Sequence, residues 1–573
     1  MLVEINKKKA LVLGGAGLVG RAICRQLIRE GIDTLVVCSL YEHEALAFKD
    51  LLRVESPQLK VEIEWGDVFL RWSLKDVSRA EVLSEATNRE VFLHDVLTPL
   101  NRNILTQSTF FHFLNKHKPD IVIDSMNTAS VLAYQNIFGV AKETYASLKQ
   151  MDEHTREVTE RLLCTQYIPQ LIRHVQIFLQ AMVENKTRVY LKIGTCGTGG
   201  MGLNIPYTHS EDRPSQMLLA KSAIAGAHSL LMFLMARTPG GPIIKELKPA
   251  AAIAWKGVGF GPIKKRGKPI LLEDVAVGEA VDLTGQLSKK NQNSAKYLCQ
   301  NGQPMPLEAP YIDTGENGLF SLGEFETLTD EGQMEFITPE EIAECAVWEI
   351  KGGNTGSDIV AAFDNSILGP TYRAGYMRNN AINRLKTLVE QTDVDSVAFE
   401  ILGPPRLSKL LYEGYLLKKC FATFNGVLSV APERMSQALQ ELVCEDLNLR
   451  SRIVSIGIPI LLSCGKKLLR GQHMAIPADV PGNVMAQFEI TDARLQHWAH
   501  DGWVDLRPDN MAVWQKRLHY IKDMIDSIPE DDSSSCFAKG EQYWEVQGGD
   551  IPLSLAKLAS WVFTHEDQGK RMK

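Results

Sequence analysis

Three glycines near the start of the chain have the spacing of a phosphate-binding turn. Gly15-x-Gly17-x-x-Gly20 follows an apolar run at residues 10–13 and precedes a helical pattern that ends at Gly31. Glycines let the backbone turn tightly and approach a diphosphate closely, and a helix N-terminus offers unpaired N–H groups to an anion. We therefore predict that this turn binds the diphosphate of a dinucleotide. A glycine-rich turn that serves only helix–strand packing is the alternative.

The residue types after the second predicted strand bear on the choice of dinucleotide. An acid at the end of that strand would bind the adenosine ribose of NAD. Residues 34–38 are followed instead by Ser39, with Glu42 and Glu44 slightly later. The missing acid, together with Arg21 directly after the last glycine, favours NADP slightly over NAD. A solvent-exposed Arg21 with no cofactor role is the alternative.

The elements that would position these residues alternate between strand and helix. Further apolar runs at residues 61–65, 120–124, 189–193 and 250–254 predict strands, and patterns at 153–182 and 215–235 predict helices. Such alternation is typical of an α/β, Rossmann-type doubly wound parallel sheet. From about residue 271 the pattern changes to long loops, and residues 395–573 are mostly helical. Thr338, Pro339 and Glu341 predict a capped helix start.

We expect three regions: an NAD(P)-binding core at residues 1–275, a lid or substrate-binding region with late core elements at 276–394, and a mainly helical C-terminal region at 395–573. The chain has 573 residues and a formal net charge of −7, with no long basic run. Nucleic acid is therefore not expected as a partner.

Several classes of site and location are not expected. The ten cysteines include no C-x-x-C pair, and no Cys/His spacing indicates a metal site. The longest apolar stretch, residues 223–236, is short for a bilayer and better suited to a buried helix. No signal peptide pattern is present at the N-terminus. We expect a cytoplasmic protein with a small-molecule substrate and no membrane partner.

Taken together, these motifs resemble the short-chain dehydrogenase/reductase superfamily, in particular its extended branch of epimerases and dehydratases. The resemblance covers about residues 8–275. It implies an adenine contact at Asp67-Val68 after the third strand and a cofactor contact at Asn127 after the fourth. The residues expected at the cofactor are Gly14, Gly15, Gly17, Leu18, Val19, Gly20, Arg21, Ser39, Asp67, Val68, Asn127 and Lys221.

Catalysis in this superfamily uses a Ser or Thr after the fifth strand and a Tyr-x-x-x-Lys helix. A lysine one helical turn from the tyrosine lowers the pKa of its hydroxyl. Thr195 matches the hydroxyl position and Lys221 the lysine, but Met217 occupies the tyrosine position. A thioether cannot transfer a proton. Tyr207 or His209 could replace the tyrosine, the lid or C-terminal region could supply the acid/base, or the site could bind a nucleotide without turning it over.

The resemblance therefore implies an NAD(P)-dependent oxidoreductase, or an epimerase or dehydratase, acting by hydride transfer at a hydroxyl or carbonyl carbon of a small polar substrate, possibly a sugar nucleotide. A redox-silent dinucleotide-binding sensor or scaffold is the alternative. The expected catalytic residues are Thr195, Lys221, Tyr207 and His209. The apolar helix at 222–235 suggests a homo-oligomer interface, although an internal contact could equally cover it.

Overall fold

The computed structural model describes residues 4–148, 152–194, 216–249, 253–265, 267–288, 296–315, 318–330, 333, 337–352, 367–368, 372–401, 405–474, 487–530 and 539–567. The chain forms two compact units. The first contains residues 1–204, 213–254 and 336–377, and the second contains 205–212, 255–335 and 378–573. The expected division into three regions, with boundaries after residues 275 and 394, stays a prediction.

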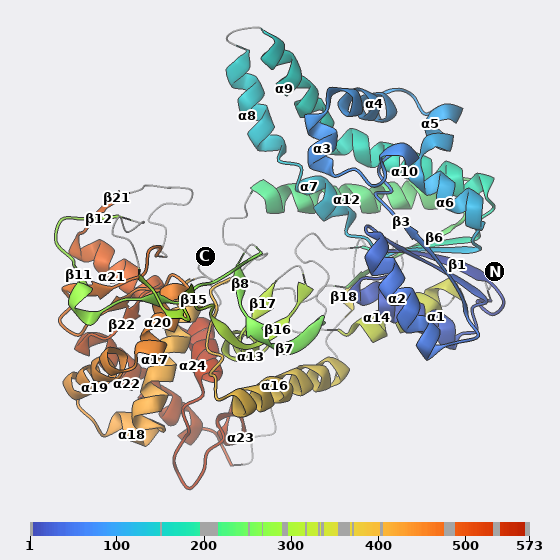
Figure 1. The fold of residues 1–573 in the computed structure, drawn as a ribbon. Helices are drawn as coiled ribbons and strands as arrows, with labels where there is room; N and C mark the ends of the chain where they lie inside the picture. The colour runs from blue at the N-terminus through green and yellow to red at the C-terminus, as the bar shows by residue number, and fades with distance from the viewer. Residues whose placement is uncertain are drawn as a thin grey trace. The chain divides into compact units, whose positions relative to one another are not determined.

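A parallel sheet of seven strands is the centre of the first unit (Figure 1). Every neighbouring pair is parallel, and the order reverses at β1, which lies between β2 and β4. This is the strand order of a doubly wound sheet, with its switch point beside β1. The predicted Rossmann-type fold class is confirmed. In spatial order the strands are β3 (Lys60–Trp65), β2 (Thr34–Ser39), β1 (Lys9–Leu13), β4 (Ile121–Asp124), β5 (Val189–Ile193), β6 (Ile243–Pro249) and β18 (Ile367–Leu368).

Helices cover both faces of this sheet. On one face, α1 (Leu18–Arg29), α2 (Glu42–Glu55) and α14 (Pro339–Ile350) share a buried apolar cluster with the strands. Thr338 and Glu341 form the predicted capping box at the start of α14. On the other face, α6 (Thr109–His117), α10 (Tyr167–Glu184) and α12 (Gln216–Ala236) form a second cluster. A strand buried on both faces is apolar throughout, which is why β1 and β4 were legible in the sequence.

The predicted helix at residues 153–182 is in fact two helices, α9 (Glu153–Cys164) and α10. The chain breaks at Thr165, whose hydroxyl donates to the Leu162 carbonyl at 2.8 Å. Pro169 lies in the first turn of α10, where its missing N–H costs nothing because that turn has no intrahelical acceptor. The remaining helical elements of the first unit are η1 (Trp72–Leu74), α3 (Arg79–Ser84), α4 (Ala86–Leu97), α5 (Arg102–Gln107), α7 (Thr128–Ala133) and α8 (Ile137–Ser147).

The sixth strand lies earlier than the sequence pattern indicates. The prediction placed it at residues 250–254, whereas β6 is Ile243–Pro249. Residues 250–252 are outside the described residues, and 253–254 belong to no strand. The strand escaped notice because it carries Lys245, Glu246 and Lys248, which do not look like core residues. Lys245 forms an ion pair with Glu349 of α14 at 3.0 Å, so its charge is tolerated beside the sheet.

The second unit is mainly helical after residue 395, as predicted. Its larger helices are α16 (Tyr372–Thr392), α17 (Pro405–Phe421), α19 (Pro432–Glu445), α20 (Leu447–Ser455), α21 (Asp492–Asp501), α22 (Pro508–Asp526) and α24 (Leu555–Trp561). The helices α19 and α20 are separated at Asp446, whose carboxylate caps α20 by accepting from the Leu449 amide at 2.9 Å. The shorter helices are η2 (Val277–Glu279), α13 (Leu322–Leu328), α18 (Phe424–Leu428), α23 (Glu541–Trp544) and η5 (Val562–Glu566).

Short antiparallel strands accompany these helices. A four-stranded sheet has the order β11 (Val281–Asp282), β20 (Lys467–Leu469), β19 (Ile460–Leu461) and β22 (Val504–Asp505), in which β19 and β22 are parallel. A second sheet has the order β17 (Leu319–Phe320), β16 (Glu308–Asp313) and β7 (Gly257–Pro262). The other strands, in pairs, are β8 (Lys264–Lys265) with β9 (Lys268–Pro269), β10 (Glu273–Asp274) with β13 (Lys296–Tyr297), β12 (Gln286–Ser288) with β21 (Gln487–Glu489), and β14 (Cys299–Gln300) with β15 (Gln303–Pro304).

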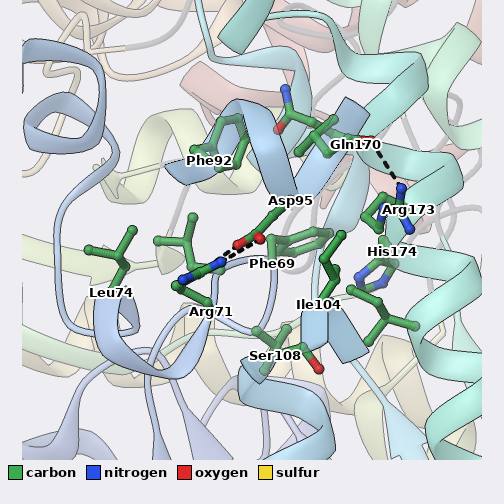
Figure 2. Close-up of a pocket in the computed structure, with 14 residues that line it drawn as sticks. Phe69, Arg71, Leu74, Phe92, Asp95, Ile104, Ser108, Gln170, Arg173 and His174 are labelled. Carbon is green, nitrogen blue, oxygen red and sulfur yellow. Dashed lines mark hydrogen bonds and ion pairs between the residues drawn. The ribbon is translucent and has the colours of Figure 1, made fainter. Parts of the chain in front are cut away.

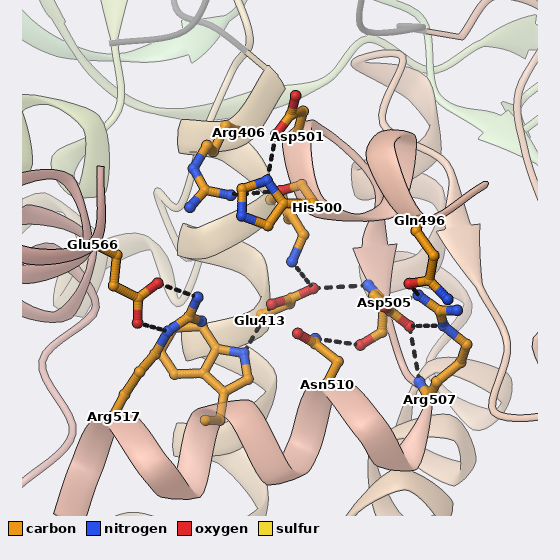
Figure 3. A network of polar contacts seen from close by, with 12 residues as sticks. Arg406, Glu413, Gln496, His500, Asp501, Asp505, Arg507, Asn510, Arg517 and Glu566 are labelled. Atoms are coloured by element: carbon orange, nitrogen blue, oxygen red, sulfur yellow. Dashed lines mark hydrogen bonds and ion pairs between the residues drawn. The ribbon is translucent and has the colours of Figure 1, made fainter. Parts of the chain in front are cut away.

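A buried polar network ties the helices of the second unit together (Figure 3). At its centre, the fully buried Glu413 of α17 accepts from the Lys409 ammonium at 2.6 Å and from the Trp514 indole at 2.8 Å. The Asp505 amide of β22 donates to the same carboxylate at 2.8 Å. Both oxygens of Glu413 are therefore paired, which is the condition under which a buried charge is tolerated.

Candidate functional site

The glycine turn connects β1 to α1 in a geometry that needs its glycines. Gly14 has a φ of +69°, a left-handed conformation that favours glycine. A Cβ on Gly15 would lie 2.9 Å from the Val12 carbonyl oxygen, and one on Gly20 would lie 2.1 Å from the Gly14 oxygen. Gly15 and Gly20 are therefore required for the strand, turn and helix to pack.

Gly17 is less crowded than Gly15 and Gly20. Among the described residues, a Cβ there would meet only the Gly14 oxygen within 4 Å, at 3.2 Å. Gly17 is the N-cap of α1 and provides no side-chain cap. The first amides of the helix, from Leu18 and Val19, have no intrahelical acceptor and are available to an anion. The turn thus fits a dinucleotide diphosphate: its backbone can be approached, and its donors are unused by a cap.

The end of β2 places an acid where the sequence showed only Ser39. The Ser39 hydroxyl donates to the Glu44 carboxylate at 2.5 Å, so Glu44 folds back from α2 to the strand end. The Arg21 guanidinium donates to the Ala16 carbonyl at 2.8 Å and lies over the Phe48 ring, 5.1 Å from its centroid. At this strand end, the negative charge of Glu44 would repel the 2′-phosphate of NADP, whereas the positive charge of Arg21 would attract it.

The end of β3 holds Asp67 in a salt bridge. Its carboxylate accepts from the Arg79 guanidinium at 2.9 Å and from the Phe69 amide at 2.8 Å. Val68 is 6% exposed and belongs to the core beneath α6 and α10. The adenine contact implied for Asp67 and Val68 stays a prediction.

The end of β4 brings the chain back beside the glycine turn. The Ser125 hydroxyl donates to the Leu13 carbonyl at 2.8 Å, and a Cβ on Gly14 would lie 3.0 Å from this hydroxyl. Asn127 caps α7 by accepting from the Ser130 amide at 3.1 Å, while its Nδ2 is buried without a hydrogen-bond partner. A buried amide with spare donors fits the cofactor contact expected for Asn127, which no observation yet tests.

A buried ion pair, which the sequence analysis did not single out, joins β4 to β5. The Lys192 ammonium, with its side chain 3% exposed, donates to Asp124 at 2.8 Å and to the Met126 carbonyl at 2.7 Å. The Tyr190 hydroxyl donates to the other Asp124 oxygen at 2.8 Å. Burial, followed by the Asp124 charge, raises the pKa of Tyr190 well above its ordinary value. In the sequence, the only indication of this ion pair was Lys192, a charged residue inside the apolar run 189–193.

A small pocket lies next to this pair at the carboxyl ends of the strands. Its walls include Asn127, Lys192, Gly194, His228 and Glu246. The Glu246 Oε2 and His228 Nε2 atoms are buried without a hydrogen-bond partner, as is Asn127 Nδ2. Burial raises the pKa of Glu246 and lowers that of His228 well below its ordinary value. Three unpaired polar atoms on one pocket can receive a water molecule or a polar ligand group.

Lys221 of α12 is buried at 3% exposure, one helical turn after the half-buried Met217. The spacing predicted for the catalytic helix is therefore present in α12. Thr195, Tyr207 and His209 lie outside the described residues, and their catalytic roles stay predictions. Among the described residues, no cluster of His, Cys, Asp and Glu could hold a metal ion.

The helix α12 is longer in its apolar part than expected. Within the described residues, its segment Leu219–Ala236 is long and apolar enough to cross a membrane, with a mean hydropathy of 1.5. The helix packs against α7, α10 and β6 and buries Lys221 and His228. These contacts, and the burial of Lys221 and His228, are typical of a core helix that covers a sheet. We therefore favour a core helix over a membrane-spanning one.

A family model described as the beta-methylindole-3-pyruvate reductase C-terminal domain matches residues 273–567, just over half of the chain. A search of curated proteins gave no match.

Solved structures with some likeness are all at low identity. Pen from Bacillus thuringiensis is 11% identical, with a TM-score of 0.27, over 62% of this chain and 68% of that one. An alcohol dehydrogenase from Thermococcus sibiricus, complexed with 5-hydroxy-NADP, is 13% identical, with a TM-score of 0.25, over 60% and 91%. A 3-oxoacyl (acyl-carrier-protein) reductase from Agrobacterium tumefaciens, with NADP bound, is 14% identical, with a TM-score of 0.24, over 43% and 70%. Such TM-scores support no argument about activity.

The strand order β3-β2-β1-β4-β5-β6-β18 and the glycine turn confirm the resemblance of the first unit to the short-chain dehydrogenase/reductase fold. The family match spans residues 273–567, so it includes most of the second unit and also α14 and β18 of the first. The first unit has a fold that resembles the short-chain dehydrogenase/reductase superfamily, and the chain belongs to the family defined by the beta-methylindole-3-pyruvate reductase C-terminal domain.

Proposed function

We propose that the chain is an NAD(P)-dependent oxidoreductase that acts by hydride transfer at a hydroxyl or carbonyl carbon of a small polar substrate. The observation that carries the proposal is the glycine turn. Gly14, Gly15 and Gly20 are needed to fold it, whereas Gly17 leaves the approach to the α1 amides open. A Cβ on Gly17 would be tight against the Gly14 oxygen, at 3.2 Å, but less so than on Gly15 or Gly20, and its absence also leaves room for a diphosphate at the α1 amides.

The residues of this chain divide the work as follows. The α1 amides bind the diphosphate, Asn127 binds near the nicotinamide end, and Lys221 holds the nicotinamide ribose. A bound nicotinamide dinucleotide supplies or accepts the hydride. Thr195 donates a hydrogen bond to the substrate oxygen, and His209 or Tyr207 moves the proton that Met217 cannot carry. The ordinary pKa of histidine suits His209 to this step.

The family description favours reduction of a carbonyl over an epimerase or dehydratase cycle, because it names a reductase. It also names an indole-bearing pyruvate, which makes 2-oxo acids with an aromatic ring the first substrates to test. Sugar nucleotides remain the second class. We further propose a cytoplasmic protein that pairs through α12, where Leu219, Leu230 and Leu234 are more than half exposed.

A redox-silent sensor is the second candidate, and the observation in its favour is Met217 at the tyrosine position. Such a protein would bind a nicotinamide dinucleotide through the same turn without changing its oxidation state. The two candidates therefore share a binding site and differ only in turnover.

The test begins with binding of NADH and NADPH, followed by nicotinamide fluorescence. Gly17→Val puts a branched side chain in the path of the diphosphate and is expected to abolish saturable binding. Gly226→Ala on α12 is the matched control, since a Cβ there meets no atom within 4 Å among the described residues. Unchanged binding by Gly17→Val would contradict the proposal.

Turnover is then measured with indole-3-pyruvate, other ketones and sugar nucleotides, as loss of reduced nicotinamide absorbance. Lys221→Met is expected to abolish turnover by an enzyme. Tight binding of the dinucleotide without turnover across the panel would favour the sensor.

A further inference from the structure

A second cavity lies beyond the end of β3, between α4, α5 and α10 (Figure 2). It is small: the centre of a water molecule can occupy about 30 Å³ of it. Most of its wall is apolar, formed by Phe69, Leu70, Phe92, Val96, Ile104 and Ile177. Arg71, Asp95, Arg173 and His174 supply the charged and titratable groups.

Arg173 has side-chain donors that no acceptor among the described residues uses. Its Nη2 donates to the carbonyls of Val96, at 3.4 Å, and Thr98, which are at the end of α4. Its Nε and Nη1 are buried without a hydrogen-bond partner, and the residue is only 8% exposed. A buried guanidinium with unused N–H groups is costly unless an acceptor is supplied. The cavity is where such an acceptor can bind.

Asp95, Gln170 and Ser108, which also line the cavity, are already hydrogen-bonded within the protein. Asp95 accepts two hydrogen bonds from Arg71, at 2.6 and 2.8 Å, so its charge is neutralised by a partner other than Arg173. The Gln170 amide nitrogen donates to the Gln135 oxygen at 2.8 Å and to the Cys164 carbonyl at 2.8 Å. The Ser108 hydroxyl donates to the Leu105 carbonyl at 2.8 Å.

The net charge of the cavity wall is therefore that of one cation. Arg71 and Asp95 cancel, and burial lowers the pKa of His174 well below its ordinary value, so this imidazole is neutral. His174 lies against the Phe69 ring, 4.3 Å between centroids, and its Nε2 also has no hydrogen-bond partner. Arg173 remains as the unneutralised charge among the lining side chains.

We propose that this cavity binds an organic monocarboxylate, with the carboxylate on Arg173 and a short apolar substituent against Phe69, Phe92 and Ile104. A single positive charge matches a single negative one, and guanidinium–carboxylate hydrogen bonds are among the stronger ones in proteins. The apolar wall favours an organic anion over a halide, because a hydrated halide gains nothing from it. The cavity adjoins the predicted adenine contact, because Val68 is also in its wall, but the proposal does not depend on the proposed function.

The experiment measures binding of sodium butyrate to the full chain by ligand-observed NMR and by thermal unfolding, without any nicotinamide nucleotide. Sodium chloride at the same ionic strength is the comparison. Saturable butyrate binding that stabilises the protein more than chloride is expected. No saturable butyrate binding, or equal stabilisation by chloride, would overturn the proposal.

Two variants approach the site from different sides. Arg173→Leu removes the cation, and Ile177→Phe fills the cavity while keeping the guanidinium. Each is expected to weaken butyrate binding about tenfold or more, the loss that goes with hydrogen bonds to a charged group. Arg102→Leu is the matched control, because Arg102 is an exposed arginine that pairs with Glu184 outside the cavity.

Because Arg173→Leu also removes the bonds to the end of α4, Arg173→Lys provides a milder change that keeps the charge. It is expected to bind butyrate with intermediate affinity. Butyrate binding that stays unchanged in both Arg173→Leu and Ile177→Phe would place the ligand elsewhere and sink the idea.

Discussion

Each unit of the molecule buries a carboxylate among cations, and the two differ in how completely they are paired. Glu413 in the second unit has donors on both oxygens, from Lys409, Trp514 and the Asp505 amide. Glu246 in the first unit accepts from Ser229 at 3.1 Å on one oxygen and has no hydrogen bond on the other. A complete network holds helices together, whereas an incomplete one beside a pocket has capacity left for a ligand or a water.

The two buried carboxylates therefore have different roles: the Glu413 network stabilises the fold, and the polar groups around Glu246 lie beside a pocket. The polar groups at the carboxyl ends of β4, β5 and β6 converge where doubly wound folds place their ligands. The network around Glu413 lies in the region that the family model matches, and its charges pair with one another. Substitutions should therefore affect mainly stability in the second unit, and pH response or ligand binding in the first.

The largest expected effect is at Glu413. Glu413→Ala leaves the buried Lys409 ammonium and the Trp514 indole without their acceptor, and should lower the free energy of unfolding by about 3–5 kcal/mol. Urea unfolding measures this value. The exposed Glu433→Ala on the neighbouring helix α19 is the control, with a loss below about 1 kcal/mol. Equal losses in the two variants would remove the distinction drawn for Glu413.

A smaller effect is expected at Lys192. Lys192→Met removes one donor from Asp124, which keeps the Tyr190 hydroxyl and accepts from the Met126 amide at 3.0 Å. The expected loss is about 1.5–3 kcal/mol, the value of a hydrogen bond to a charged group. The same urea measurement on the exposed Lys142→Met provides the baseline. If the free energy of unfolding fell as much as it does in Glu413→Ala, the buried ion pair of the first unit would be as important for stability as the network of the second.

At Glu246 the expected effect is a change in pH dependence. The Glu246 carboxylate is surrounded by polar and charged side chains: Ser229, Lys248, Lys192, Asp124 and His228. Its pKa is raised in the folded protein, mainly by burial, so the folded chain holds a proton that the unfolded chain releases. Wild-type stability is thus lost as the pH rises from the ordinary pKa of 4.5 through the folded value.

Glu246→Gln removes that titration. The variant should match the wild type at acid pH and gain on it as the pH approaches neutrality, measured by urea unfolding over a pH series. A stability difference that does not vary with pH would show that Glu246 does not titrate in this way.

The smallest expected effect is on nucleotide preference, at the end of β2 that is predicted to contact the adenosine ribose. Glu44→Gln removes the charge beside Ser39 and should raise the affinity for NADPH relative to NADH about two- to fivefold, the range of a solvent-screened charge interaction. Arg21→Ala should shift the ratio the other way. Fluorescence titrations with both nucleotides measure it. A ratio insensitive to both substitutions would place the 2′-position away from this strand end.

The first turn and most strands could be placed from the sequence because their patterns lie within a few neighbouring residues. The apolar runs of β1, β2 and β4 are flanked by glycine or proline turns, and the Thr338–Glu341 capping box marks α14. The sixth strand was misplaced because Lys245, Glu246 and Lys248 look solvent-exposed in a sequence. Their burial depends on partners from α14 and α12, which only the folded chain brings close.

The candidate site was predictable to the same extent. Its glycines follow from their spacing, and its lysine was implied by the resemblance to the short-chain dehydrogenase/reductase superfamily. The acid at the end of β2 was not predicted, because Glu44 reaches Ser39 only when the chain folds back at the start of α2. The unpaired donors of Arg173 had no signal at all, since they depend on where α4 and α10 leave a cavity.

The amino-acid sequence alone thus determined the parallel α/β core, the diphosphate turn and the helical character of the C-terminal region, because periodicity and glycine spacing act over a few neighbouring residues. Only the tertiary structure decided which buried charges are satisfied and which face a pocket. Pairing energy depends on distances between segments that are often far apart in sequence, as between Glu413 and Trp514 or between Arg406 and Asp567.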